Sequence, residues 1–432
     1  MNKGTQSSKK YIFTLARVSF LIFVALVLPR FFLVEQNTKI TSLNHEIFKL
    51  GVESLTDEFL LGLSPQNSTD YTVGLVTNHT ALDQKGNRTT EILLSKGLKI
   101  KKVFVPEDDF FAYKKNCNAD LIDDSTEIPL AMLGHIDSLK KSREYNFSDV
   151  DVLFFDMQDS GINPSVAMTT LLKTLQSVAK QNKTMVVLDR PNLLGCSMEG
   201  IINDGANDRD ESIPVPMRHG MTCGELARYF NTTLLANAAR LFVVPMQNYT
   251  RDLFSHSSTA AHASLLTNID AYYGASFLPV LGAVKPFDIG LGTDLAFSCL
   301  FLPESEGVSK QKWFELRALL KEQGIETSWH RYYNPKKKCY YSGLRFLVRN
   351  VDQFSPFNTV VTVVHFFKDA GVPLSFLPEF DHIFGGKKMR SFLEGKCARH
   401  DLEYAVNKGL KTFFNKAHSS LIYKPTPKVV LL

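Results

Sequence analysis

The chain has 432 residues, a length that fits two or three folded units. Hydrophobic residues make up 44% and charged residues 22%, which excludes the disordered, collagen-like and coiled-coil classes. The net charge is +5, but 49 basic residues are set against 44 acidic ones along the whole length, so the composition does not favour nucleic-acid binding. The richest basic run, Lys336-Lys337-Lys338, lies beside Tyr340 and Tyr341 and fits either a base-stacking surface or a solvated loop; short charge runs usually indicate the loop.

The N-terminal residues have the pattern of a membrane anchor. Residues 1–10 carry three lysines and no acid, and Val18–Leu28 is apolar apart from one serine. With its apolar flanks, segment 11–34 is long enough to cross a bilayer as a helix, and no small-residue cleavage site or lipobox cysteine follows it. We therefore expect a cytoplasmic tail at 1–10, a transmembrane anchor or signal at 11–34, a stem at 35–70, and the bulk of the chain in the periplasm or at the cell surface. A buried N-terminal helix is the alternative.

From the stem onward, the sequence predicts a short helix at 46–55 and then alternating strands and helices. Apolar strands separated by helices are typical of a parallel sheet covered on both faces, so we expect a Rossmann-like α/β domain at 71–270. Thr222 and Glu225 form a capping box that opens its last helix. The predicted strands are 71–76, 98–105, 151–155, 184–188 and 241–245, and the predicted helices are 89–96, 165–181 and 222–231.

Beyond residue 270 the alternation is less regular. The sequence predicts a helix at 310–323 and a strand at 344–348, while 360–367 fits either a strand or a helix. We expect a smaller α/β auxiliary domain at 271–432. The six cysteines of the chain are widely dispersed and lack the spacing of metal ligands, so no metal is predicted.

Polar side chains follow the predicted strands of the first domain. In open parallel sheets, ligands bind beyond the carboxyl ends of the strands. Carboxylates, amides and a guanidinium together suit a polyhydroxylated ligand and supply paired carboxylates for acid–base chemistry, although each residue alone also fits a turn or a helix cap. Arg218 and His219 precede the capped helix and either point to the same edge or hold the turn. The strand-end candidates are Asn78, Glu107, Asp156, Gln158, Asp159, Asp189, Arg190 and Asn192.

Several common motifs are missing from the sequence. There is no G-x-G-x-x-G after a strand and no Walker A motif, which disfavours nicotinamide, flavin or nucleotide binding on this sheet. G-x-S-x-G and H-E-x-x-H are also absent. No cofactor is therefore predicted.

A long, ordered set of segments resembles one known family. They are Val73–Asp83, Phe104–Glu107, Asp151–Gly161, Val186–Gly195, Met198–Gly200, Ile213–Asn231, Val243–Asp252, Pro286–Gly290, Phe380–Arg390 and Ser420–Tyr423. In these segments the chain resembles the bacterial exo-β-N-acetylmuramidase family (NamZ- or YbbC-like peptidoglycan hexosaminidases), with divergent substrate loops. The resemblance implies a Rossmann-like catalytic domain with a smaller auxiliary domain, and peptidoglycan-derived amino sugars or muropeptides as partners.

The resemblance also implies roles for the strand-end residues. The catalytic acid of the family falls on Glu107, and Asp156 and Asp159 would orient sugar hydroxyls or activate water. Arg190 would pair with the lactyl carboxylate of a muramic residue. The remaining expected substrate-binding residues are Asn78, Gln158, Asp189, Asn192, Arg218 and His219.

The sequence departs from the family at three places. Asp108-Asp109 replaces the His-Gly that follows the catalytic glutamate, and like-charge repulsion from these aspartates is expected to raise the pKa of Glu107. Segments 256–270 and 280–285 replace two substrate loops. Two functions follow as expectations: an exo-acting glycoside hydrolase that removes terminal N-acetylmuramic acid or a related amino sugar, or a catalytically inactive glycan-binding protein of the cell envelope.

Overall fold

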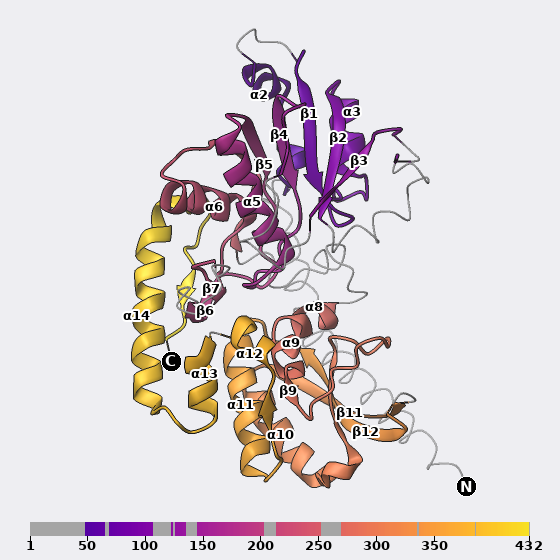
Figure 1. The fold of residues 1–432 in the computed structure, drawn as a ribbon, viewed down its shortest axis with the longest axis vertical. Coiled ribbons are helices and arrows are strands. Elements are labelled where there is room, and N and C mark those ends of the chain that lie inside the picture. The colour runs from indigo at the N-terminus through magenta and orange to yellow at the C-terminus, as the bar shows by residue number, and fades with distance from the viewer. Residues whose placement is uncertain are drawn as a thin grey trace, which may run out of the picture. The chain divides into compact units, whose positions relative to one another are not determined.

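A parallel sheet of six strands, in the order β3-β2-β1-β4-β5-β8, forms the first half of the computed structural model (Figure 1). The five predicted strands are confirmed, and β3 is an additional short edge strand with partly exposed side chains. The bounds are β1 Thr72–Thr77, β2 Lys99–Pro106, β3 Leu130–Leu133, β4 Val152–Asp156, β5 Thr184–Leu188 and β8 Arg240–Val244. The structure describes residues 48–64, 69–106, 122–123, 126–134, 145–202, 213–251, 269–334, 337–384 and 386–431.

Two helices of this half, α5 and α6, begin at capping side chains. The Ser165 hydroxyl accepts a hydrogen bond from the Met168 N–H at the start of α5, and the capping box of Thr222 and Glu225 opens α6. A π-helical turn continues α6 through Phe230–Leu234. The three predicted helices are therefore confirmed as α3 Thr89–Ser95, α5 Val166–Lys180 and α6 Cys223–Tyr229.

The strand order reverses at β1. The chain steps from β1 to β2 and β3 in one direction and from β4 to β5 and β8 in the other. Right-handed crossovers then place α3 and α5 on opposite faces of the sheet. Along the strands, residues alternate between the two faces, and Val76, Phe104, Phe155 and Val187 share a buried cluster with Leu171 of α5. This arrangement is the Rossmann-like α/β fold that the sequence predicted.

The segment before β1 packs onto the sheet. The sequence predicted a helix at 46–55. The described part of this segment instead has a 3-10 turn at Val52–Ser54, and the helix α2 lies further along, at Asp57–Gly62. The predicted position of the helix is therefore wrong. The Thr56 side chain accepts from the Phe59 N–H, and two acidic residues in the first turn favour a start at Asp57. Gly51 lies against backbone atoms of Asp189 and Val244, where a Cβ atom has no room.

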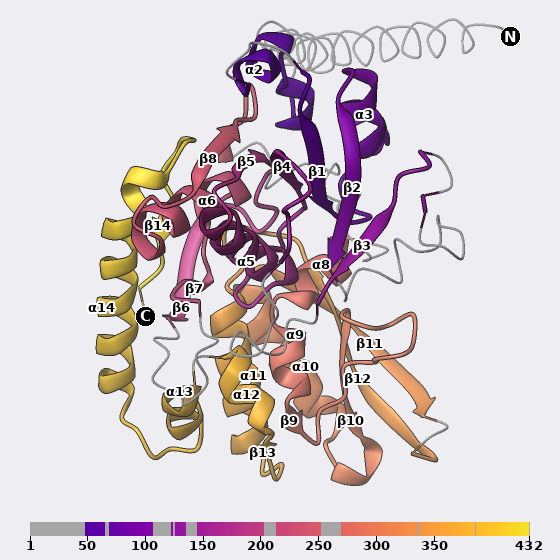
Figure 2. The ribbon, with the colours of Figure 1, turned by 45° about the horizontal axis from the view of Figure 1, so that its top comes forward.

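Smaller sheets and seven α-helices make up the described residues from 269 onward (Figure 2). β12 pairs antiparallel with β10 and β11, and β9 pairs with β13. The predictions of a helix at 310–323 and a strand at 344–348 are confirmed. The bounds are α8 Ile269–Ala275, α9 Leu278–Gly282, β9 Val284–Lys285, β10 Cys299–Pro303, α10 Lys310–Glu322, β11 Ile325–Asn334, β12 Cys339–Val348, α11 Pro356–Asp369, β13 Ser375–Phe376, α12 Pro378–Ile383 and α13 Gly386–Leu393.

Helix α11 resolves the ambiguous segment 360–367. Its β-branched valines also suit a strand, but Ser355 caps the helix and Pro356 occupies the first turn. The buried side chains of Val360, Val363, Val364 and Phe367 follow a spacing of three and four residues. One helix face is thereby buried.

The C-terminal residues return to the first half of the chain. Strand β14 (Lys428–Val429) pairs with β6 (Ser197–Ile202), which also pairs with β7 (Pro216–Arg218). The preceding helix α14 (Arg399–Ala417) places the ring of Phe413 5.0 Å from that of Tyr229. The predicted division between residues 270 and 271 stays a prediction.

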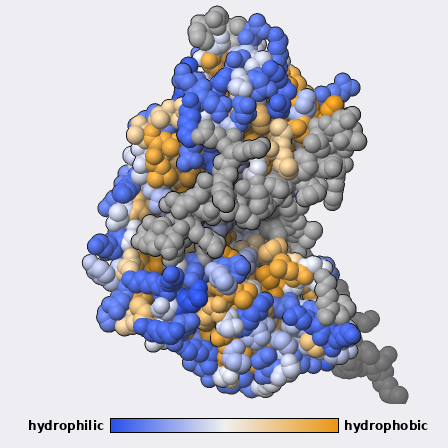
Figure 3. All heavy atoms as spheres, in the orientation of Figure 1, coloured by the Kyte–Doolittle hydropathy of each residue, from blue (hydrophilic) through white to orange (hydrophobic). Residues whose placement is uncertain are grey.

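Among the residues that the structure describes, no helix is long and apolar enough to span a bilayer. The tail and anchor predicted at 1–34 lie outside these residues. On the face shown in Figure 3, hydrophilic side chains are interspersed with smaller hydrophobic patches.

Candidate active site

The carboxyl ends of the parallel strands meet along one edge of the six-stranded sheet. The order of the strands reverses at β1 and β4, where Thr77 pairs with Asp156. A doubly wound sheet binds ligands at such a switch point, so the residues after β1 and β4 flank the candidate site. Glu107 follows Pro106, the last residue of β2, but lies outside the described residues.

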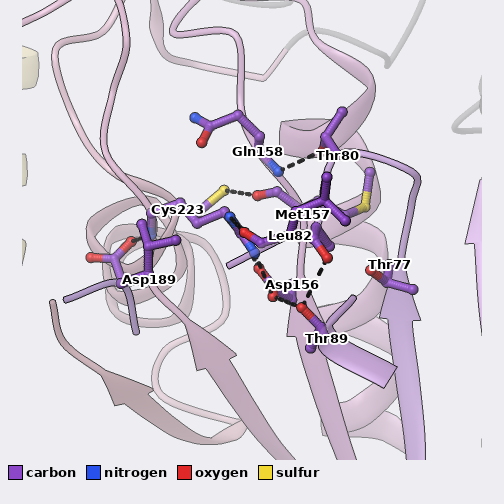
Figure 4. A network of polar contacts seen from close by, with 12 residues as sticks. Thr77, Thr80, Leu82, Thr89, Asp156, Met157, Gln158, Asp189 and Cys223 are labelled. Carbon is purple, nitrogen blue, oxygen red and sulfur yellow. Dashed lines mark hydrogen bonds and ion pairs between the residues drawn. The ribbon is translucent and has the colours of Figure 1, made fainter. Parts of the chain in front are cut away.

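Asp156, the last residue of β4, forms a buried ion pair with Arg190. Figure 4 shows the Asp156 carboxylate and its contact with Thr89. The Arg190 NH2 group donates to Oδ2 of Asp156 at 2.8 Å, and Nε donates to Oδ1. The Thr89 hydroxyl also donates to this carboxylate, and the remaining guanidinium nitrogen donates to the Leu82 carbonyl at 2.8 Å. Burial lowers the pKa of Arg190, but the charge and hydrogen bonds of Asp156, together with other nearby acidic groups, outweigh this effect and raise it, so the guanidinium stays charged. Asp156 and Arg190 are therefore hydrogen-bonded to each other and to neighbouring buried groups of the protein.

Asp159 holds the turn after β4 to the start of helix α5. Its Oδ2 accepts from the Gly161 N–H at 2.7 Å and contacts His219 Nε2 at 3.0 Å, and its Oδ1 accepts from the Ser165 hydroxyl at 2.5 Å. Burial alone would raise the pKa of Asp159, but the bonds from His219, Ser165 and Gly161 lower it. Because His219 Nδ1 accepts from the Met221 N–H at 3.2 Å, its proton lies on Nε2 and points to Asp159.

Asp189 is the centre of a third buried group. Its Oδ1 accepts from the N–H groups of Arg190 at 2.9 Å and Gly224 at 2.7 Å. Its Oδ2 accepts from the hydroxyls of Thr222 at 2.8 Å and Tyr423 at 2.7 Å. Burial raises the pKa of Asp189 to about 6, against the effect of these hydrogen bonds. The carboxylate joins the end of β5 to the start of α6.

Three amide side chains also lie in the described part of this edge. The Asn78 carbonyl oxygen accepts from the N–H and the hydroxyl of Thr80, and Asn192 bonds to the backbone of Leu194 and Met221. Gln158 is partly exposed and donates from Nε2 to the carbonyls of Asp159 at 2.9 Å and Pro191 at 2.7 Å. Its amide thereby links the turns after β4 and β5.

Arg218 has other partners than the buried carboxylates Asp156, Asp159 and Asp189. Its guanidinium donates to the carbonyls of Leu194 and Phe354, the latter at 2.9 Å, and lies 3.7 Å from the Glu199 carboxylate. The structure therefore brings together the predicted residues after β1, β4 and β5 with His219, while Arg218 ties β7 to the second half of the chain. The catalytic and binding roles of all these residues stay predictions.

Several residues of the site were not found by the sequence analysis. Thr89 bonds to Asp156, Tyr423 bonds to Asp189, and the Tyr272 hydroxyl donates to the Ser160 carbonyl at 2.6 Å. The buried Cys223 thiol contacts the Met157 carbonyl at 3.6 Å, and burial together with nearby aspartates raises its pKa. These partners come from distant segments, so no local pattern could have indicated them. In the described parts of the chain, no group of three or more His, Cys, Asp and Glu residues is placed to hold a metal ion.

The fold and this polar edge define a doubly wound α/β protein with a candidate site at its topological switch point. Residues 73–265 match the family model of the N-terminal part of exo-β-N-acetylmuramidase NamZ. The chain is also 24% identical over 361 residues to the peptidoglycan β-N-acetylmuramidase NamZ of Bacillus subtilis (strain 168), a match that covers 81% of this chain and 86% of the relative. Both matches support the resemblance to the NamZ family that the sequence predicted.

Two solved structures share the fold. Both are DUF1343 family proteins from Bacteroides fragilis NCTC 9343. The first is 22% identical with a TM-score of 0.70 and covers 87% of this chain and 99% of its own. The second is 19% identical with a TM-score of 0.65 and covers 88% and 100%.

Proposed function

We propose that this protein is an exo-acting glycoside hydrolase that removes terminal N-acetylmuramic acid, or a related amino sugar, from peptidoglycan fragments. The observation that carries the proposal is the match of residues 73–265 to the NamZ model, because this segment holds every strand of the six-stranded sheet except the first residue of β1. The polar residues after β1, β4 and β5 supply donors and acceptors for sugar hydroxyls at the same edge.

Glu107 is the proposed general acid. It comes directly after β2, which lies beside β1 at the switch point, and it would protonate the glycosidic oxygen of the leaving group. The two aspartates that follow it would keep its carboxyl protonated nearer to neutral pH.

The buried carboxylates act in this proposal through the groups that they hold. Asp156 keeps Arg190 charged and oriented, and Asp159 fixes both the tautomer of His219 and the turn that carries Gln158. These aspartates are therefore positioning residues, and Gln158 and Asn78 are the amides on the two sides of the switch point that would contact the sugar.

A catalytically inactive glycan-binding protein of the envelope is the second candidate. The observation in its favour is the sequence after β2, where Asp108 and Asp109 replace the family's His-Gly, together with the replaced loops at 256–270 and 280–285. Such changes leave the scaffold in place while they alter the site.

The test compares the full chain with its Glu107→Gln variant on a chromogenic N-acetylmuramic acid glycoside. We expect kcat/KM to fall by about 100-fold or more in the variant, which is the usual contribution of a general acid, with unchanged thermal unfolding. Glu322→Gln, an exposed glutamate at the end of α10, is the matched control. Equal turnover by the Glu107 variant would reject this residue as the acid. A folded chain that binds the sugar saturably without turnover would support the second candidate.

We also propose that the bulk of the chain is extracytoplasmic and that residues 11–34 anchor it. The support is the sequence pattern, with lysines before an apolar segment of membrane-spanning length. Protease added to intact cells is expected to digest residues after 35 while a tag fused before residue 1 stays protected. Protection of both sides would contradict this placement.

A further inference from the structure

The outer face of the β11–β12 hairpin carries exposed aromatic and basic side chains that the proposed active site does not use. Tyr333 pairs directly with Tyr340 in the ladder, and Arg331 pairs with Ser342. Because side chains alternate along a strand, Arg331, Tyr333 and Tyr340 share one face of this ribbon. The two tyrosines are 49% and 46% exposed. Figure 2 shows the hairpin at the lower right, to the right of β10.

The opposite face of the hairpin is packed against the protein. Tyr332 stacks on Tyr341 with ring centroids 5.6 Å apart and lies 4.8 Å from the ring of Phe301 in β10. The Tyr332 hydroxyl also contacts Asp288 at 3.1 Å. The inner tyrosines thus anchor the ribbon, and the outer face is presented on a fixed frame.

Contacts among the outer side chains hold them in place. Tyr333 and Tyr340 meet edge to face at 5.1 Å, and the Arg331 guanidinium lies 3.8 Å from the centre of the Tyr340 ring. Two hydrogen bonds of 2.6 and 2.9 Å hold that guanidinium to the Glu304 carboxylate. Little side-chain freedom remains to be lost when a ligand packs on these rings.

The same face continues along β11 toward helix α10. Trp329 lies two residues before Arg331, with the Lys310 ammonium 5.3 Å from its ring. At the other end, the exposed Lys337 and Lys338 form the turn of the hairpin. From Trp329 to Tyr333 the strip is about 13 Å long at the usual rise of a strand. We call the partly buried Trp329, the exposed Arg331, Tyr333 and Tyr340, and the exposed turn lysines Lys337 and Lys338 together the aromatic-basic face.

We propose that the aromatic-basic face is a second, non-catalytic binding surface for the anionic glycan chain of peptidoglycan. The inference rests on the proposed function, because its ligand, peptidoglycan, is the substrate in that proposal. Sugar rings present apolar C–H faces that pack on exposed tyrosine rings, and the lactyl and peptide carboxylates of the polymer complement Lys337 and Lys338.

The charge of this face favours a glycan over a nucleic acid. Glu304 neutralises Arg331, so the two turn lysines supply the net positive charge among the described members. Nucleic-acid binding depends mainly on many contacts to phosphates, and this face is too weakly charged to supply them. A polymer of sugar rings with scattered carboxylates fits better.

The test is co-sedimentation of the full chain with purified insoluble peptidoglycan. We expect Tyr333→Ala/Tyr340→Ala to weaken binding by about 10-fold or more, as for central aromatic contacts in other interfaces. Tyr404→Ala is the matched control, because Tyr404 is 69% exposed on α14 with the Lys408 ammonium 5.8 Å from its ring. Turnover of the small chromogenic glycoside is expected to be the same in both variants and the parent chain.

The outcomes separate this inference from the proposed function. Equal sedimentation of the double variant and the parent overturns the inference, whatever the turnover. A parent chain without turnover whose sedimentation still depends on the two tyrosines supports the inference and rejects the hydrolase. Tyr333→Phe/Tyr340→Phe keeps both rings, so loss of binding in that variant overturns the stacking contact. Tyrosine-dependent binding of single-stranded DNA without retention on peptidoglycan overturns it in favour of a nucleic acid.

Discussion

The hydroxyl of Tyr423 donates to Oδ2 of Asp189 at 2.7 Å, although the two residues are 234 positions apart. The same hydroxyl accepts from the Met246 N–H at 2.9 Å. The C-terminal segment therefore completes the bonding of a carboxylate at the carboxyl edge of the six-stranded sheet. The C-terminal segment is therefore structurally part of the half of the chain that forms the six-stranded sheet.

Asp189 is expected to make stability depend on pH. Burial raises its pKa from 3.8 to about 6, so between pH 4 and 6 the folded state binds more protons than the unfolded state. The free energy of unfolding then falls as pH rises through this window, by at most about 3 kcal/mol from this group. In Asp189→Asn this pH-dependent loss is absent. The free energy of unfolding of the variant is therefore expected to increase relative to that of the parent chain as pH rises from 4 to 6. Urea unfolding of both proteins across this pH range measures the difference, and Asp352→Asn, at an exposed aspartate, is the control. Parallel pH profiles of unfolding free energy for Asp189→Asn and the parent chain would contradict the raised pKa of Asp189.

Removal of one partner from the Asp156–Arg190 pair is expected to be costly. Asp156→Ala leaves the Arg190 charge buried without compensation, which typically costs about 3–5 kcal/mol of unfolding free energy. Asp156→Leu/Arg190→Met removes both charges and is expected to cost less than the sum of the single changes. Urea denaturation of the parent chain, both single variants and the double variant measures the coupling. Additive costs would mean that the pair contributes no coupling energy.

Glu225 is expected to hold the C-terminal segment in place. Its Oε2 accepts from the Thr222 N–H, while its Oε1 accepts from Arg251 and from the N–H groups of Ile422 at 2.8 Å and Tyr423 at 3.2 Å. Glu225→Gln leaves the Arg251 charge uncompensated and is expected to destabilise the protein by about 3–5 kcal/mol.

Hydrogen exchange of the Ile422 and Tyr423 amides provides the local measurement for Glu225→Gln, and faster exchange is expected. Glu403→Gln breaks an exposed pair with Arg399 and serves as the control, with an expected change below about 1 kcal/mol. Unchanged exchange of both amides in Glu225→Gln would show that the segment is held by other contacts.

Two glycines are expected to respond in opposite directions to alanine. A Cβ atom at Gly343 in β12 would lie 1.9 Å from the Leu300 carbonyl oxygen of β10, so Gly343→Ala must move a strand and is expected to cost about 1–3 kcal/mol. At Gly62, in α2, nothing lies within 4 Å, and Gly62→Ala is expected to add about 0.5–1 kcal/mol through helix propensity. Thermal unfolding measures both, and a Gly343→Ala variant as stable as the parent would contradict the predicted clash.

The fold was predictable where a local pattern determines the local structure. Buried strands such as β4 and β5 are short apolar segments, and α6 begins at a capping box that is visible in four consecutive residues. Strand β3 was missed because it has four residues and an exposed edge. Helix α11 stayed ambiguous because its valines suit a strand as well as a helix.

The amino-acid sequence alone was enough to predict which polar residues follow the strands, the position of Glu107 after β2, and the resemblance to the NamZ family. Only the three-dimensional structure shows that β1 and β4 are neighbours. It also shows that Thr89 and Arg190 bond to the Asp156 carboxylate and that His219 contacts the Asp159 carboxylate. The physical reason is that strand order and side-chain hydrogen bonds depend on distances through space, and local sequence patterns carry no information about those distances.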